Sequence, residues 1–169
     1  MSLLHCTDHP IVLSTLFTED IYLIPDKKPD PNTPVQKKVS PAEIYFEYLG
    51  ENNTYFLIVI ADKKHPQIAP ITLQILLKIM LAKGLTEKDL AIVNYANYPG
   101  VTFNELKAFF ACTKIALLGI NPQHLQLPPI AANQPETIQQ VKVLTSYSIE
   151  EMQANETKKR QFWHVMKNF

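Results

Sequence analysis

The sequence predicts an α/β fold: a three-layer αβα sandwich with a mostly parallel central sheet of about four strands plus an antiparallel edge hairpin. Three apolar segments, 55–61, 90–95 and 114–120, have the composition of strands that are buried on both faces. Segments of helix length separate them, a pattern typical of right-handed crossovers between parallel strands. We therefore expect helices to cover both faces of one sheet.

The chain divides at about residue 41. Its 169 residues fit one domain, which we place at 42–169, behind an N-terminal extension at 1–41. Within the extension, residues 25–41 carry five prolines among Lys, Asp and Asn, a composition that supports neither a helix nor an inner strand. This Pro-rich linker is either a long surface loop or a tether for a partner.

The first elements of the domain are predicted as a hairpin. Residues 43–49 are rich in aromatic and branched side chains, and residues 50–53 are turn formers ahead of the strand at 55–61. A helix over 68–83 follows, with Pro70 in its first turn and Gly84 at its end. Its surface is apolar almost all round, so most of its circumference must be covered.

Capping patterns mark the later helices. Thr102 with Glu105 predicts a capping box at the start of a helix over 102–111, and Ser148 with Glu151 predicts a second box. A fourth strand is expected at 141–145, after a polar connection over 121–136, and a closing helix at 156–169.

Charge and cysteine content limit the class of protein. Sixteen basic and sixteen acidic residues balance, so no general field attracts nucleic acid or an anionic membrane. The opening residues lack the basic and apolar regions of a signal peptide, and no apolar run reaches about 20 residues, so we expect neither secretion nor a membrane span. The two cysteines, Cys6 and Cys112, lack the spacing of a disulfide framework or zinc site, so we expect a cytoplasmic protein.

The predicted strand ends offer little chemistry. Asp62 and His65 follow the first buried strand and could act as acid and base, but a solvated turn is the better interpretation because no nucleophile or second carboxylate accompanies them. Neither common Gly-rich phosphate motif is present, and the histidines lack metal-ligand spacing. We therefore expect no cofactor and no metal.

Two groups of residues are candidates for nucleic-acid contact. Tyr95 and Tyr98 lie in a loop with asparagines and could stack on bases. Lys158, Lys159 and Arg160 form the basic side of the closing helix, although a solvated face is the simpler interpretation. The opposite side of that helix carries the apolar residues expected to seal the core: Phe162, Val165, Met166, Phe169. Trp163 is also expected to be mostly buried.

Several stretches together resemble the psi subunit family of bacterial DNA polymerase III. The strand FLIVIAD precedes a long helix ending LLKIMLAKGL, and KIALLGINP follows later. The closing TSYSIEEMQANETKKRQFWHVMK is the most specific part, with Lys159, Arg160 and Trp163 ahead of Met166. The resemblance covers about residues 43–169, and TEDIYLI at 18–24 weakly resembles the N-terminal region of that family.

The resemblance implies a fold like that of uracil-DNA glycosylases without their activity, and a non-enzymatic adaptor of the replisome. A psi-like protein binds a clamp-loader subunit through its N-terminal segment and links it to a chi-like subunit. The docking residues would then be those just before the linker: Leu16, Phe17, Ile21, Tyr22, Leu23, Ile24. The alternatives are a diverged base-excision enzyme that uses Asp62 or His65, and a nucleic-acid-binding module.

Overall fold

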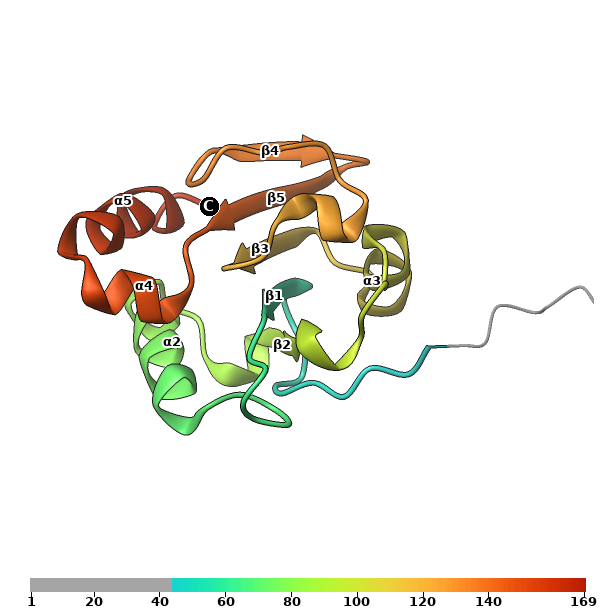
Figure 1. The fold of residues 1–169 in the computed structure, drawn as a ribbon, viewed down its shortest axis with the longest axis horizontal. Coiled ribbons are helices and arrows are strands. Elements are labelled where there is room, and N and C mark those ends of the chain that lie inside the picture. The colour runs from blue at the N-terminus through green and yellow to red at the C-terminus, as the bar shows by residue number, and fades with distance from the viewer. Residues whose placement is uncertain (1–43) are drawn as a thin grey trace, which may run out of the picture. The chain divides into compact units, whose positions relative to one another are not determined.

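A five-stranded mixed sheet forms the centre of the domain (Figure 1). The computed structural model describes residues 44–169. The strands run in the order β2-β1-β3-β5-β4, with bounds β1 Phe56–Ile60, β2 Leu90–Asn94, β3 Lys114–Leu118, β4 Pro135–Ile138 and β5 Val141–Ser146. All pairs are parallel except β4 with β5. The predicted α/β class and the four parallel strands are confirmed.

Helices cover both faces of this sheet. On one face lie α2 Pro70–Ala82, α4 Ile149–Ala154 and α5 Glu156–Met166, and on the other lies α3 Phe103–Phe110 (Figure 1). None of the helices within residues 44–169 combines the length and apolar character needed to cross a bilayer. The layered arrangement explains why the central strand is continuously apolar.

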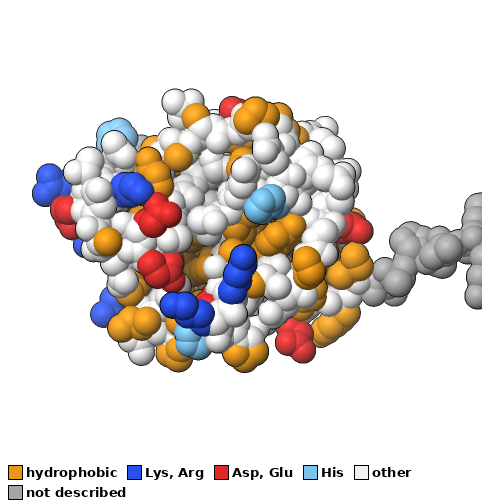
Figure 2. Space-filling model, in the orientation of Figure 1, with side chains coloured by type: hydrophobic (Ala, Val, Ile, Leu, Met, Phe, Trp, Pro, Cys, Tyr) orange, Lys and Arg blue, Asp and Glu red, His pale blue; other side chains and the backbone are white. Residues whose placement is uncertain are grey.

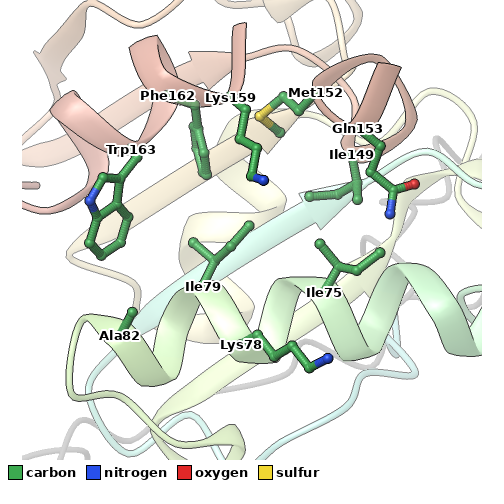
Figure 3. Close-up of a pocket in the computed structure, with 10 residues that line it drawn as sticks. All are labelled: Ile75, Lys78, Ile79, Ala82, Ile149, Met152, Gln153, Lys159, Phe162 and Trp163. Atoms are coloured by element: carbon green, nitrogen blue, oxygen red, sulfur yellow. The ribbon is translucent and has the colours of Figure 1, made fainter. Parts of the chain in front are cut away.

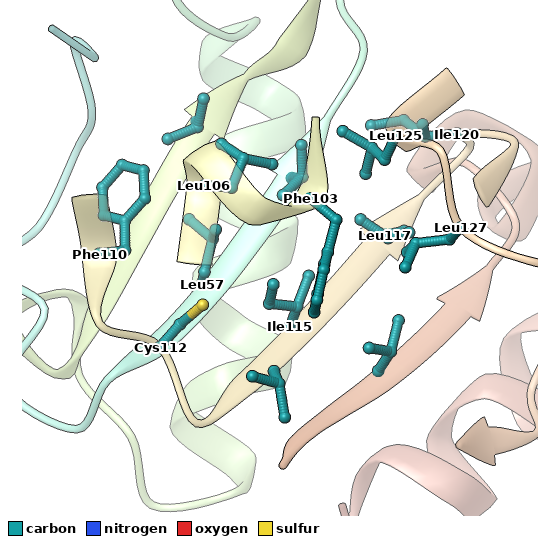
Figure 4. Packing of buried hydrophobic residues seen from close by; sticks show 14 of the residues in the cluster. Leu57, Phe103, Leu106, Phe110, Cys112, Ile115, Leu117, Ile120, Leu125 and Leu127 are labelled. Carbon is teal, nitrogen blue, oxygen red and sulfur yellow. The ribbon is translucent and has the colours of Figure 1, made fainter. Parts of the chain in front are cut away.

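The side chains of β1 alternate between two cores. Leu57 and Val59 point into the core under α3, which Figure 4 shows with Phe103 and Leu106 packed on the sheet. Ile58 and its neighbours in β1 point into the core under α2, α4 and α5. All five residues of β1 are buried, as a strand between two helix layers requires.

The predicted hairpin at 43–49 is wrong. Leu49 makes an isolated antiparallel bridge to Ile92 of β2, with both backbone N–H to O distances at 2.9 Å. It cannot pair with β1, because β2 and β3 already occupy both edges of that strand. The antiparallel edge strand is instead β4, which begins at the end of the segment predicted to be a polar connection, 121–136, and continues to Ile138. Since β4 is mostly exposed, it carries no apolar pattern that would have identified it.

One capping box is complete and the other is half formed. Thr102 Oγ1 accepts from the backbone N–H of Glu105 at 3.3 Å, and the Glu105 carboxylate accepts from the Thr102 N–H at 2.7 Å. Ser148 Oγ accepts from Glu151 N–H at 3.2 Å. The Glu151 carboxylate turns away to Lys158 Nζ, 2.6 Å distant, so it does not close the second box. An ion pair between α4 and α5 has replaced the local hydrogen bond of the capping box.

The expectation that Trp163 is mostly buried is confirmed only in part, since 36% of the residue is exposed and it lies at the surface. The inner face of α5 is taken by Phe162 and Met166, with Phe169 just beyond the helix, and all three are buried. Trp163 follows Phe162 directly, so it lies about 100° further round the helix. The predicted apolar seal is confirmed, and the indole ring lies beside it on the surface.

Candidate protein-interaction site

The carboxyl end of β1 is held by Asp62, the first candidate acid or base. Its carboxylate accepts hydrogen bonds from the backbone N–H of Lys64 at 2.9 Å, His65 at 3.2 Å and Ala69 at 2.9 Å. His65 Nδ1 lies 2.9 Å from the second oxygen and must carry the proton, since a carboxylate only accepts. Asp62 therefore shapes the loop that leads into α2.

The pKa of Asp62 reflects these bonds. Partial burial by itself raises the pKa, but the donors from Lys64, Ala69 and His65 together hold it below its ordinary value of 3.8. A general base for water needs a free oxygen and a pKa nearer neutrality. Asp62 has neither property, which leaves its structural role as the better explanation.

Asn94 joins the loops that follow β1 and β2. Its Oδ1 accepts from the N–H of Asp62 at 3.0 Å and of Ala96 at 3.1 Å, and its Nδ2 donates to the carbonyls of Asp62 at 2.8 Å and His65 at 3.1 Å. The side chain is buried and all of its hydrogen-bonding positions are used. The strand ends where a parallel sheet commonly binds ligands are thus tied to each other.

The two candidate tyrosines pack against the core under α3. Tyr95 Oη donates to the carbonyl of His124 at 3.0 Å, and Tyr98 Oη accepts from the N–H of Glu47 at 2.7 Å. Both rings pack partly buried against that core, Tyr98 with its centroid 4.9 Å from Phe46. Their hydroxyl groups fix neighbouring segments of backbone.

The basic residues of α5 lie over the opposite face of the sheet from these tyrosines. Each has an acidic neighbour: Lys158 pairs with Glu151 at 2.6 Å, and Lys159 and Arg160 both lie 3.7 Å from Glu156. Figure 2 shows acidic and basic side chains intermixed over α4 and α5. The structure therefore does not join the tyrosines and the basic residues into one nucleic-acid surface.

The most unusual surface belongs to α2. Only Thr72, Leu76 and Met80 of this 13-residue helix are buried. Ile71 and Leu81 are each 66% exposed. A helix that is apolar on every side is normally covered on every side. Among the residues that the structure describes, the domain covers α2 only on the side that faces the sheet.

An apolar groove runs between α2 and the α4–α5 pair (Figure 3). It has a volume of about 430 Å³. Ile75 and Ile79 of α2 point across it toward Met152 and Phe162, and Trp163 lies at one end beside Ala82. We name this the α2 groove, lined by Ile75, Lys78, Ile79, Ala82, Ile149, Met152, Gln153, Lys159, Phe162 and Trp163.

A smaller hollow flanks α2 on its other side. Its volume is about 350 Å³, and it is lined by Gln74, Leu77, Lys78, Leu81, Leu85, Thr86 and Glu87. Lys78 belongs to both hollows, so it stands on the ridge between them. The ridge and the α2 groove together form an extended apolar surface, and they are the candidate site.

The sequence indicated this site only indirectly. The apolar circumference of α2 predicted cover, but the pattern could not show which side the domain itself leaves bare. The proposed docking residues Leu16, Phe17 and 21–24 lie outside the described residues. Across residues 44–169, no group of three His, Cys, Asp or Glu side chains is placed to hold a metal ion.

No protein-family model matches the chain, and no curated protein matches it significantly.

Proposed function

We propose that this protein is a non-enzymatic adaptor, similar to the psi subunit of bacterial DNA polymerase III, that links a clamp-loader subunit to other replication proteins. The observation that carries the proposal is the bare apolar side of α2, with Ile71 and Leu81 both 66% exposed beside the α2 groove. Apolar surface of this kind marks a protein-binding face more often than a small-molecule site.

The strand ends support an adaptor over an enzyme. The Asp62 carboxylate accepts hydrogen bonds from three backbone N–H groups and one imidazole. The Asn94 amide is hydrogen-bonded to four backbone groups. Residues that build loops in this way are not available to activate water. The scaffold of a glycosylase-like enzyme would then be retained for binding, as the resemblance to the psi family implies.

The resemblance implies that two regions of the chain bind different partners. The N-terminal residues, including Leu16, Phe17, Ile21 and Tyr22, would bind the clamp-loader subunit. The α/β domain would bind a second protein, for which a chi-like subunit is the candidate. The α2 groove is the surface on the domain that fits this second role.

Calorimetric titration of the full-length protein against the cognate clamp-loader subunit tests the proposal. We expect saturable binding, weakened at least about tenfold by Phe17→Asp in the proposed docking segment, because a charge replaces an apolar anchor. The control Ser2→Asp places the same charge outside that segment. Failure of the two proteins to associate would overturn the adaptor function.

A base-release assay tests the enzymatic alternative directly. The purified protein is incubated with uracil-containing and damaged DNA, and free base is measured. We expect no release above the protein-free control. Release that Asp62→Asn abolishes would show that the protein is an enzyme, and the proposal would be withdrawn.

A further inference from the structure

The charged residues that line the α2 groove are of one sign. Among the described residues that line it, the only charged ones are Lys78 and Lys159. Lys159 Nζ lies 3.7 Å from a carboxylate oxygen of Glu156, but both side chains are more than half exposed, so the pair is weak. Lys78 makes no ion pair with any described residue. A carboxylate brought to the groove would meet two available ammonium groups.

The spacing of the lining residues fits a helix. Ile75, Lys78 and Ala82 follow one another at intervals of three and four residues, so they form a straight ridge along α2, and the exposed Ile71 lies four residues before Ile75 on the same side of the helix. Phe162 and Trp163 face this ridge from α5 (Figure 3). A third helix laid between α2 and α5 would insert its apolar side chains between theirs.

A second copy of the chain fits this surface poorly. A twofold pairing of α2 with α2 would bring Lys78 of each copy toward Lys78 of the other, because the lysine stands on the ridge between both hollows. Like charges facing each other in an interface oppose association. A different protein with carboxylates at its rim has no such conflict.

We propose that the α2 groove binds an amphipathic helix of a partner protein, with apolar side chains at i, i+3, i+4 and i+7 flanked by Asp or Glu. The apolar side chains pack against Ile75, Ile79 and Phe162, and the carboxylates pair with Lys78 and Lys159. Trp163 is the aromatic anchor at the end of the groove. The inference rests on the proposed function only in that the domain binds a protein.

The test uses the full-length protein and three synthetic peptides of about 15 residues, a length that can form a helix on binding. The first has the proposed apolar spacing with Glu at the flanks, the second has Lys in place of every Glu, and the third is a scrambled form of the first. Trp163 is the only tryptophan, so its fluorescence reports occupancy of the groove directly. Calorimetry measures the affinity.

We expect the Glu peptide to bind and to shift the Trp163 emission to shorter wavelength as the ring is covered. Binding should weaken at least about tenfold with Lys78→Glu, and it should weaken as salt is raised. Ile79→Asp should weaken it about thirtyfold or more by placing a charge in the groove floor. Lys63→Glu, the same charge reversal in the loop after β1, should leave the affinity unchanged.

Three results would overturn the inference. The Lys or scrambled peptide could bind as well as the Glu peptide, Lys78→Glu could leave binding unchanged, or a single-stranded oligonucleotide could shift Trp163 where the Glu peptide does not. Concentration-dependent dimerisation that Ile79→Asp abolishes would assign the groove to a second copy instead. Clamp-loader binding, lost with Phe17→Asp and kept with Lys78→Glu, remains a separate readout of the proposed function.

Discussion

The side chain of Asn94 binds both backbone groups of Asp62, accepting from its N–H at 3.0 Å and donating to its carbonyl at 2.8 Å. This pair continues the pairing of β1 with β2 beyond the last residues of the two strands, Ile60 and Asn94. The Asn94 side chain makes the hydrogen bonds that a further residue of β2 would make through its backbone. The loop that carries Asp62 and His65 is therefore fixed from the neighbouring strand.

Replacing Asn94 should destabilise the fold. Asn94→Ala removes a buried amide and leaves several partly buried backbone groups without partners, so we expect a loss of about 2 kcal/mol in the free energy of unfolding. Asn53→Ala is the matched control, since Asn53 is exposed and should cost less than about 0.5 kcal/mol. Urea unfolding measures both. Equal effects would show that the Asn94 bonds contribute nothing.

Asp62 should make stability depend on acid pH. Its pKa is lower in the folded state than its ordinary value of 3.8, so its contribution is complete above that value and is lost as pH falls through the folded pKa. Asp62→Asn should be less stable than the natural protein at pH 7, and the difference should shrink below about pH 4. Unfolding curves that stay equally far apart from pH 7 to pH 3 would contradict this.

Phe162 and Trp163 should differ sharply in their contribution to stability. Phe162 is 1% exposed in the core, so Phe162→Ala should cost about 3 to 5 kcal/mol. Trp163→Ala should cost clearly less than Phe162→Ala, because about a third of the residue is already in water. Thermal and urea unfolding of the two variants test this. A larger loss for Trp163→Ala would mean that the ring is buried in solution.

Gly119 should tolerate no side chain. Its φ is +71°, and an added Cβ would lie 2.7 Å from Cβ of Ser148, the residue that caps α4. Gly84 has a similar φ of +82° with no atom within 4 Å. Gly84→Ala should therefore cost about 1 kcal/mol for the backbone alone, and Gly119→Ala clearly more. Similar unfolding midpoints for the two variants would rule out the clash.

Cys112 should be unreactive in the folded protein. The thiol is buried under α3, and burial raises its pKa to about 11. In a Cys6→Ser variant, a thiol reagent at pH 8 should label Cys112 only as fast as the protein unfolds. Labelling in low and high urea measures this. Rapid labelling of the native variant would show that the core under α3 opens easily.

The elements that the sequence predicted correctly are those with local causes. Continuous apolar runs located β1, β2 and β3, because a strand covered on both faces needs no polar alternation. Thr102 and Glu105 located the start of α3, because both partners of the capping box lie within four residues. The same reasoning missed β4, an exposed strand that exists only through its pairing with β5.

The sequence by itself determined the layers of the domain, the inner face of α5 and the apolar character of α2. Tertiary structure decided the rest, because it depends on contacts between different elements: Leu49 with Ile92, Glu151 with Lys158, and Asn94 with Asp62. The sequence predicted that α2 needs cover over most of its circumference. Only the packing of α4 and α5 showed that one side of α2 stays exposed. The sequence pattern shows which residues are apolar, but it does not show which of them other parts of the domain cover.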